Sequence, residues 1–401
     1  MTHSAATQGA LSGLHVLDLT RVLAGPFSTV MLADMAAEII KIEQPGKGDD
    51  TRHCAPFQNG ESACCMNLNR GKKGVTLDFK GKAREMFLER GKTADVVVEN
   101  CRPGTMDKLG LGCEVLKEVN PKLVHAAVSG FGDAGLYRLR PGCDISPQAM
   151  GGLMSTTGWP GGEPTRSGTA MADVLAGLSV TIGTPAALRH RDEAGVGQKV
   201  DVALVDPVVA SLEVITPIYL SEGRVPERIG NRCESCYPCD SFAASDGSVV
   251  ITAANDKLWR LVCRTLGQPA LADFEGFDTK AKRVQRHAEI KPLVEAWTLT
   301  QTVDEVVEKM LAAGVPASPV NTLGRLAVDP HIAVAREMFI DVEHPKAGRM
   351  RLTGAHIKLS APRPRVCVPA PQLGEHNEVV FGGLLGHSED RLAQLRSEGV
   401  I

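Results

Sequence analysis

The sequence from Ser167 to Arg189 reads SGTAMADVLAGLSVTIGTPAALR, and its single carboxylate, Asp173, lies among small and apolar residues. From Met171 onward this composition predicts a buried helix that kinks at Pro185 rather than ending there. Five small residues form a surface that another backbone or a flat ligand can approach closely: Ala170, Ala172, Ala176, Gly177 and Gly183. Because Asp is rarely buried without a partner, Asp173 is either a reactive carboxylate or an N-terminal helix cap, and its position near the helix start favours the cap.

The chain before this helix alternates short strands with helices. The pattern predicts strands at 14–19, 38–42, 75–79, 95–99 and 123–128, and helices at 26–37, 82–90 and 114–120. This alternation predicts an α/β fold with a large doubly wound parallel sheet. The segment NCRPG, from Asn100 to Gly104, directly follows the strand 95–99, which has a β-branched centre. It therefore lies where open parallel sheets bind ligands.

The chain of 401 residues exceeds what one hydrophobic core usually supports, so more than one domain is expected. We predict a large α/β domain in 1–222, a small α+β domain in 223–325, and a C-terminal segment, 326–401, that returns to the large domain. The polar stretch 43–60 is expected to be loop, and 205–220 is expected to be one helix. Further predicted elements are a strand at 199–204, a strand at 248–253, helices at 256–266, 281–297, 303–313, 376–385 and 388–398, and a hairpin formed by 339–343 and 350–353.

The composition of the chain limits which partners and which cellular compartment are expected. The net charge of −3 gives no electrostatic reason to expect nucleic acid or an anionic membrane as partner. The sequence has no run of about 18 apolar residues and no basic-then-apolar leader, so neither a transmembrane helix nor a signal peptide is expected. Eleven scattered cysteines are typical of free thiols in a reducing compartment, which indicates a cytoplasmic protein.

Two further motifs suggest ligand sites of other kinds. The loop from Gly130 to Pro141 is rich in glycine and carries Arg138 and Arg140, but it lacks the spacing of a dinucleotide-binding fingerprint. The CxxCxxC motif of Cys233, Cys236 and Cys239 has ligands for zinc or an iron–sulfur cluster. Because a fourth ligand at the usual spacing is missing, we favour an ordinary cysteine-rich loop. Paired metal spacing is also missing from the histidines, such as His53, His125, His287 and His331, so no metal site is predicted.

Several blocks of sequence, in order along nearly the whole chain, resemble the class III coenzyme A transferases. This family includes formyl-CoA transferase, carnitine CoA-transferase and succinyl-CoA–glutarate CoA-transferase. The matching blocks are VLDLTRVLAGPF (16–27), AAEIIKIEQPGKGDDTR (36–52), VVVENCRPGTMDKLGLG (96–112), Asp144 with Gln148, the Asp173 stretch, and PQLGEHNE (371–378).

This resemblance implies a function and a set of site residues. Asp173 would be the nucleophile that moves CoA from an acyl-CoA to a free carboxylic acid, through an aspartyl anhydride and an aspartyl-CoA thioester. No cofactor is implied, and backbone N–H groups of nearby glycine loops would stabilise the oxyanions. The family folds as an interlocked homodimer of ring-like chains. The CoA groove would be lined by Ala24, Gln44, Leu77, Asn100, Cys101, Arg102, Lys108 and one of Arg138 and Arg140.

Two positions bear on the substrate and on the alternatives. Leu23 stands where formyl-CoA transferases carry a glutamine beside the thioester, which argues against formyl or oxalate transfer. The opening block and the turn Asn69–Lys73 more closely resemble the succinyl-CoA–dicarboxylate branch. The related 2-methylacyl-CoA racemases carry a histidine where this chain has Cys143, and a neutral buried thiol is a poor base. A racemase therefore remains an alternative, and so does a CoA-binding protein without catalysis if Asp173 is only a cap.

Overall fold

The structure is a computed structural model that describes residues 9–79, 82–360 and 368–401. Its contacts divide the chain into two units. The first comprises Met1–Leu153, Arg166–Thr216 and Pro330–Ile401, and the second Met154–Thr165 and Pro217–Asp329. The predicted domains did not assign 154–165 to the second unit. The segment belongs there because it is hydrogen-bonded to the chain between α10 (Thr216–Glu222) and β9 (Cys239–Ala244): the N–H of Gly230 donates to the carbonyl of Gly158 at 2.9 Å.

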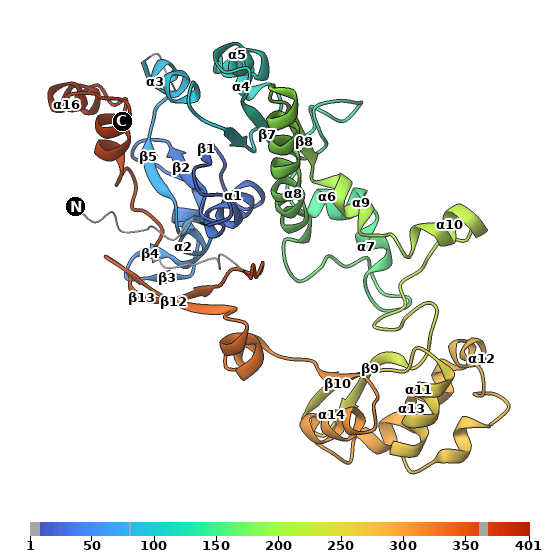
Figure 1. The fold of residues 1–401 in the computed structure, drawn as a ribbon. Coiled ribbons are helices and arrows are strands. Elements are labelled where there is room, and N and C mark those ends of the chain that lie inside the picture. Colours follow the sequence, from blue (N-terminus) through green and yellow to red (C-terminus); the bar gives the residue numbers. More distant parts are fainter. Residues whose placement is uncertain (1–8, 80–81, 361–367) are drawn as a thin grey trace. The chain divides into compact units, whose positions relative to one another are not determined.

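The first unit is built on one sheet of six parallel strands, which confirms the predicted α/β fold (Figure 1). The strands are β1 (His15–Asp18), β2 (Glu38–Glu43), β5 (Lys73–Thr76), β6 (Val96–Glu99), β7 (Val124–Ser129) and β8 (Lys199–Ala203). Their spatial order is β5-β2-β1-β6-β7-β8. The strand order therefore reverses between β1 and β6, and ligands of such sheets bind beyond the carboxyl ends of the strands at that point.

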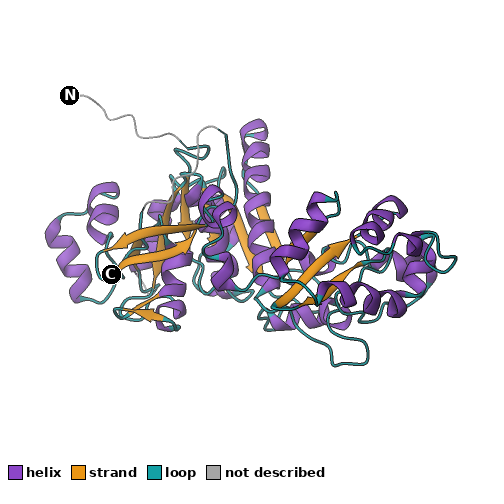
Figure 2. Ribbon diagram, turned by 90° about the horizontal axis from the view of Figure 1, so that it is seen from below, coloured by secondary structure: helices purple, strands orange, loops and turns teal. Residues whose placement is uncertain are grey.

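Helices flank this sheet (Figure 2). Both of its faces are buried, because alternate residues of β1, β2 and β6 enter different cores. Val16 and Val96 belong to the core that α1 (Ala24–Asp34) and α8 (Met171–Ala194) cover. Leu17 and Val97 belong to the opposite core. That core is covered by α3 (Lys82–Gly91), α4 (Thr105–Lys108), α5 (Cys113–Val119), the π-helical turn η4 (Glu378–Leu384) and α16 (Glu389–Ser397).

Helix α8 forms as predicted and continues through Pro185. Its small residues meet other elements of the protein. A Cβ on Gly177 would lie 2.8 Å from the carbonyl oxygen of Ala24 in α1, and one on Gly183 would lie 2.8 Å from the side chain of Val200 in β8. By length and composition α8 could cross a membrane, a test that core helices also pass. Here its contacts are with α1, β7 and β8.

Two predictions for the large domain were wrong in detail. The expected helix at 205–220 is two helices, α9 (Val205–Ala210) and α10 (Thr216–Glu222), because Pro217 has no N–H to donate to a preceding turn. The expected loop at 43–60 contains the 3₁₀ turn η1 (Asp50–His53) and strand β3 (Phe57–Gln58), which pairs with β4 (Glu61–Ser62). A short helix, α2 (Ala63–Asn69), follows. The glycine-rich stretch after β7 leads to α6 (Ile145–Met150) and α7 (Leu153–Thr156).

The second unit is a small α+β structure around the buried Trp259. Strands β9 (Cys239–Ala244), β10 (Gly247–Thr252) and β11 (Ala317–Pro319) form an antiparallel sheet in the order β11-β10-β9. Its helices are α11 (Asp256–Thr265), η2 (Pro269–Ala272), α12 (Lys280–Gln285), α13 (His287–Thr298), α14 (Val303–Ala312) and α15 (Leu323–Leu326). Two of these, α12 and α13, replace the single helix expected at 281–297.

The chain after 330 packs on the first unit. It contains the turn η3 (Pro330–Ala335) and the hairpin of β12 (Phe339–His344) and β13 (Gly348–Thr353). The PQLGEHNE block then covers the outer edge of β5. His376 exchanges two hydrogen bonds with the backbone of Gly74, and the side-chain oxygen of Asn377 accepts from the N–H of Thr76. This block therefore satisfies an exposed sheet edge.

Candidate active site

Two neighbouring cavities open at the point where the strand order reverses. The first, of about 200 Å³, is walled by the segments after β1, β6 and β7 and by the start of α8. The second, of about 360 Å³, is walled by the segments after β1, β2 and β5 and by α4. Arg21 and Cys101 line both cavities, so the two are adjacent. The site thus occupies the carboxyl edge of the sheet, where its topology places ligands.

The structure brings most of the expected CoA-binding residues to these cavities. The first cavity is lined by Ala24, Asn100, Cys101, Arg102 and Arg140, and the second by Gln44, Leu77 and Cys101. Arg138 instead lines a third cavity, of about 280 Å³, which Arg102 also borders. Lys108 is exposed at the end of α4 and lines none of these three cavities.

Asp173 lines the first cavity from the first turn of α8. The sequence-based reading of Asp173 as the helix cap is wrong, because the N-cap residue is Ala170. The carboxylate of Asp144 performs that function from outside the helix. Its Oδ1 accepts hydrogen bonds from the N–H groups of Ala172 at 2.9 Å and Asp173 at 3.3 Å. Asp173 therefore does not cap the helix. Within the described residues, its own carboxylate has no hydrogen bond or ion pair.

The electrostatic environment of Asp173 favours its neutral form. Burial raises the pKa of this carboxyl, and the nearby charge of Asp144 raises it further, from 3.8 to about 6. At neutral pH Asp173 is therefore ionised but poorly solvated, and it lacks a partner cation in the described residues. A carboxylate in that state is more nucleophilic than one held in an ion pair. Perturbed carboxyls of this kind gather at functional sites.

Gln148 positions the groups around Asp173 from α6. Its side chain is fully buried, and its Nε2 donates to Oδ2 of Asp144 at 2.6 Å. Its Oε1 accepts from the N–H of Ser167 at 3.0 Å. Gln148 therefore links the capping carboxylate to the segment that leads into α8. The sequence paired Asp144 with Gln148 only through the resemblance, and the geometry supplies the physical reason for the pair.

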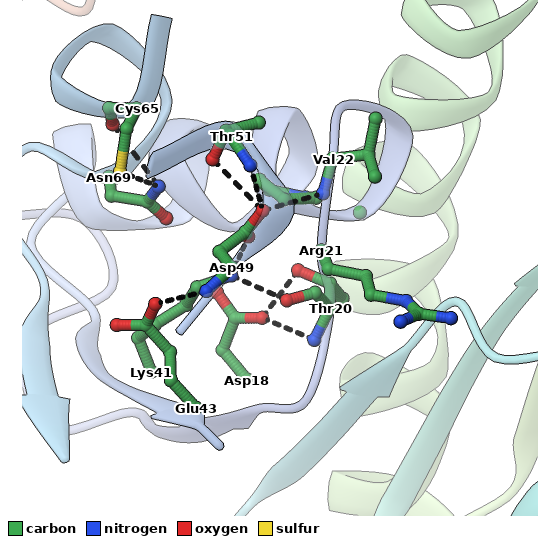
Figure 3. A network of polar contacts seen from close by, with 12 residues as sticks. Asp18, Thr20, Arg21, Val22, Lys41, Glu43, Asp49, Thr51, Cys65 and Asn69 are labelled. Carbon is green, nitrogen blue, oxygen red and sulfur yellow. Dashed lines mark hydrogen bonds and ion pairs between the residues drawn. The ribbon is translucent and has the colours of Figure 1, made fainter. Parts of the chain in front are cut away.

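A buried network of charges holds the segment after β1 in place (Figure 3). Lys41 donates to Oδ2 of Asp49 at 2.7 Å and also to the carbonyl of Thr20. Oδ1 of Asp49 accepts from the N–H of Val22 at 3.2 Å. Burial opposes the ionisation of Asp18, but the ammonium groups of Lys72 and Lys41 lower its pKa to about 2. The charges at these positions are thus compensated within the network.

Val22 lies in the left-handed region of backbone space, with φ of +68°. This conformation is costly for a β-branched residue, and the surrounding structure must enforce it. The N–H of Val22 is held by Asp49, and the residue lines the first cavity. The signal in the sequence was weak, because nothing in the letters TRVLAG marks a residue with positive φ.

Asn100 joins the segments after β1 and β6 across the reversal of strand order. Its Oδ1 accepts from the N–H of Arg21 at 2.9 Å, and its Nδ2 donates to the carbonyl of Arg21 at 2.7 Å. An amide is the one neutral side-chain group that offers a donor and an acceptor in this spacing. Arg21 was missed in the sequence, although its place directly after a strand at the sheet's carboxyl edge was a usable signal.

The cavity that contains Asp173 has both signs of charge on its walls. Three arginines, Arg21, Arg102 and Arg140, line the same cavity as Asp144 and Asp173. Guanidinium groups bind carboxylates and phosphates in bidentate geometry. The site can therefore hold an anionic ligand beside the unpaired carboxylate of Asp173.

Cys143 also lines this cavity, beside Asp144, but its thiol is exposed rather than buried. The expectation of a buried thiol at this position was wrong, because the loop before α6 leaves it at the surface. It makes one long contact, 3.9 Å from its sulfur to Oγ of Ser146.

Comparison with known proteins places the chain among enzymes of CoA transfer. Residues 11–377 match the family described as CoA-transferase family III. The succinyl-CoA–D-citramalate CoA-transferase of Chloroflexus aurantiacus is 38% identical over 394 residues, which are 98% of each chain. The succinyl-CoA:mesaconate CoA-transferase of Haloarcula hispanica is 38% identical over 379 residues, 92% of this chain and 94% of that one. Among solved structures, a CaiB/BaiF family protein from Brucella suis is 35% identical with a TM-score of 0.85, over 94% of this chain and 100% of that chain.

Proposed function

The chain belongs to CoA-transferase family III, as the resemblance predicted, and we propose that it moves CoA from succinyl-CoA to a small dicarboxylic acid with Asp173 as nucleophile. The observation that carries this proposal is the unpaired, partly buried carboxylate of Asp173 at a cavity with three guanidinium groups. A carboxylate that only capped a helix would be paired with backbone N–H groups, and Asp144 occupies that position instead.

The proposed reaction has four steps in which bonds are exchanged without a net proton. An oxygen of Asp173 attacks the thioester carbonyl of the donor, the C–S bond breaks, and CoA leaves as a thiolate. The thiolate attacks the aspartyl carbonyl of the resulting anhydride, and the donor acid leaves as a carboxylate. The acceptor carboxylate then attacks the aspartyl-CoA thioester and expels the thiolate. Finally the thiolate attacks the acyl carbonyl of the second anhydride and releases the new acyl-CoA with free Asp173.

The protein's contribution is to position these groups and to keep water out. We propose that CoA extends from the second cavity into the first, which brings its thioester to Asp173 and leaves its phosphates in the second cavity, near Lys47 and Arg21. The helix N-terminus that carries Asp173 favours developing negative charge on the tetrahedral intermediates. Water in this cavity would hydrolyse the anhydride, so a closed site favours transfer over hydrolysis. These steps need no cofactor.

The class of acid follows from charge. A dicarboxylate presents one carboxylate for reaction and a second for recognition, and the arginines of the first cavity offer the second a partner. The similar enzymes that act on D-citramalate and mesaconate take dicarboxylates, and both are named as using succinyl-CoA. We therefore propose a dicarboxylate of four or five carbons in its main chain as acceptor.

A panel of acids tests this function. The purified protein is incubated with succinyl-CoA and each of glutarate, mesaconate, citramalate, oxalate and formate, and the acyl-CoA products are identified by mass spectrometry. Transfer to one or more of the dicarboxylates, with oxalate and formate poor, is the expected result. Parallel samples contain formyl-CoA as donor, or a 2-methylacyl-CoA in heavy water. Transfer only from formyl-CoA, or deuterium gain at the α-carbon of the 2-methylacyl-CoA without transfer, would reject the proposal in favour of formyl transfer or the racemase.

We also propose that the working form is an interlocked homodimer in the cytoplasm. Large apolar side chains of the first unit are exposed, which favours a partner surface there: Ile182, Val209 and Val214. The ten cysteines of the described residues are all free, which suits a reducing compartment. Light scattering at nanomolar concentration should give a dimer mass, and a monomer that forms on dilution would contradict interlocking.

A further inference from the structure

The CxxCxxC motif becomes a compact cluster of thiols in the folded second unit. The sulfur atoms of Cys233, Cys236 and Cys239 all lie within 4.8 Å of one another. Cys233 and Cys236 belong to the loop before β9, and Cys239 is the first residue of that strand. The sequence alone favoured an ordinary cysteine-rich loop because a fourth ligand was missing. The folded arrangement goes further, since two loop residues and the first residue of β9 bring their sulfur atoms together.

The backbone of this loop is fixed from several directions. The N–H of Cys233 donates to the carbonyl of Cys239 at 3.0 Å, which closes the loop on itself. The fully buried Arg283 donates to the carbonyl of Tyr237 at 2.9 Å. The N–H of Ala253 donates to the carbonyl of Pro238. The positions of the thiols are therefore set by bonds that the sulfur atoms do not make themselves, as in a preorganised site.

The spacing of the three sulfur atoms suits a single bound metal ion. Zinc–thiolate bonds are about 2.3 Å long, and in tetrahedral geometry they hold two sulfur atoms about 3.8 Å apart. The cluster is within about 1 Å of that spacing before any ion is present. The hydroxyl of Ser235 lies 3.6 Å from the sulfur of Cys233, so a polar group is next to the cluster.

We propose that Cys233, Cys236 and Cys239 bind one zinc ion through three thiolates, with water in the fourth position. Among the described residues, this group of possible metal ligands consists of these three cysteines alone. The neighbouring carboxylate of Asp240 is engaged by Lys291, 3.2 Å away, and is not available as a fourth ligand. On binding, each thiol releases its proton to solvent. The ion ties the loop to β9 and has no part in the transfer chemistry, so this proposal stands apart from the proposed function.

Zinc content and thiol protection test the proposal on the full chain, without reference to transferase activity. The reduced protein is supplied with zinc, passed over a chelating resin, and analysed for metal by plasma mass spectrometry. We expect about one zinc ion per chain. Iodoacetamide followed by peptide mass spectrometry should leave the three cluster cysteines unmodified while the exposed Cys54 is alkylated. Chelation in denaturant should then make all of them reactive.

Matched variants separate a specific site from scattered binding by thiols. Cys233→Ser and Cys239→Ser should each lower the zinc content at least tenfold, because each removes a ligand. Cys54→Ser should keep the full content. Zinc near zero in the reduced wild type would overturn the proposal, and that result does not depend on any variant folding. So would full zinc retention in the Cys233→Ser/Cys239→Ser double variant, or a disulfide within the cluster in place of metal.

Discussion

Replacing Asp173 by Asn should make the protein more stable at neutral pH, although it removes the proposed nucleophile. The folded structure raises the pKa of this carboxyl from 3.8 to about 6. Each pKa unit corresponds to about 1.4 kcal/mol, so ionisation of Asp173 costs the fold about 3 kcal/mol. Residual solvent at this partly buried group reduces the effect, and we expect a gain of about 1–3 kcal/mol from the neutral amide.

The size of the stability difference between Asp173→Asn and the wild type depends on pH. Below pH 3.8 Asp173 is protonated in both the folded and the unfolded chain, so the amide confers no electrostatic gain. Between pH 3.8 and about 6 the unfolded chain ionises first, and the wild type loses stability as pH rises. Above pH about 6 the penalty is complete and constant. The advantage of Asp173→Asn should therefore be absent near pH 3.5, grow through this window, and be full at pH 7.

Thermal unfolding of the two proteins from pH 3.5 to pH 8 measures this difference. In domains of 150–250 residues 1 kcal/mol shifts Tm by about 2–4 °C, so Asp173→Asn should melt several degrees higher at pH 7. Asp144→Ala is the matched control, because it removes the true cap of α8 and should destabilise by about 0.5–2 kcal/mol. A variant Asp173→Asn that is equally stable or less stable at pH 7 would refute the reasoning, since a helix cap tolerates that exchange.

Three other predictions follow from the same geometry. The value of kcat/KM should fall tenfold per pH unit below about pH 6, where Asp173 takes up its proton, and stay level from pH 7 to 8. A fall in kcat/KM that begins only near pH 4 would contradict the raised pKa of Asp173. Asn100→Ala should raise the KM for the acyl-CoA roughly tenfold, because two hydrogen bonds to Arg21 are lost at about 0.5–1.5 kcal/mol each; an unchanged KM in steady-state assays would show that this link is dispensable. Gly177→Ala should cost about 1–3 kcal/mol in denaturant unfolding, since the new Cβ would lie 2.8 Å from the carbonyl oxygen of Ala24, whereas Gly383→Ala, with open space around it, should not destabilise; equal stabilities would contradict the tight packing of α1 on α8.

The sheet could be predicted because its signals are local. Strands such as 95–99 have unbroken β-branched centres, and their alternation with helices restricts the topology to a parallel sheet. The break between α9 and α10 was missed although Pro217 marks it, because the apolar pattern of 205–220 was given more weight than the proline. Strand β9 was missed because it belongs to the cysteine motif and its apolar pattern is short.

The site could be predicted only in part, because its decisive contacts join distant segments. Asp173 could be singled out as a lone carboxylate in an apolar stretch, yet sequence physics favoured a cap. The residue that does the capping, Asp144, lies 29 positions away, and no local rule pairs the two. The thiol cluster is a similar case, since the spacing of Cys233 and Cys239 gives three ligands without saying that the loop folds them onto one centre.

The central claim is that Asp173 becomes covalently attached to the acyl group and then to CoA, and trapping this adduct tests it most directly. The protein is incubated with succinyl-CoA, quenched, digested and analysed by mass spectrometry, with a parallel sample treated with hydroxylamine. The peptide that contains Asp173 should carry CoA, and after hydroxylamine it should carry a hydroxamate at that residue, while Asp173→Asn should show neither and turn over orders of magnitude more slowly. An adduct on another residue, or full activity of Asp173→Asn, would contradict the account.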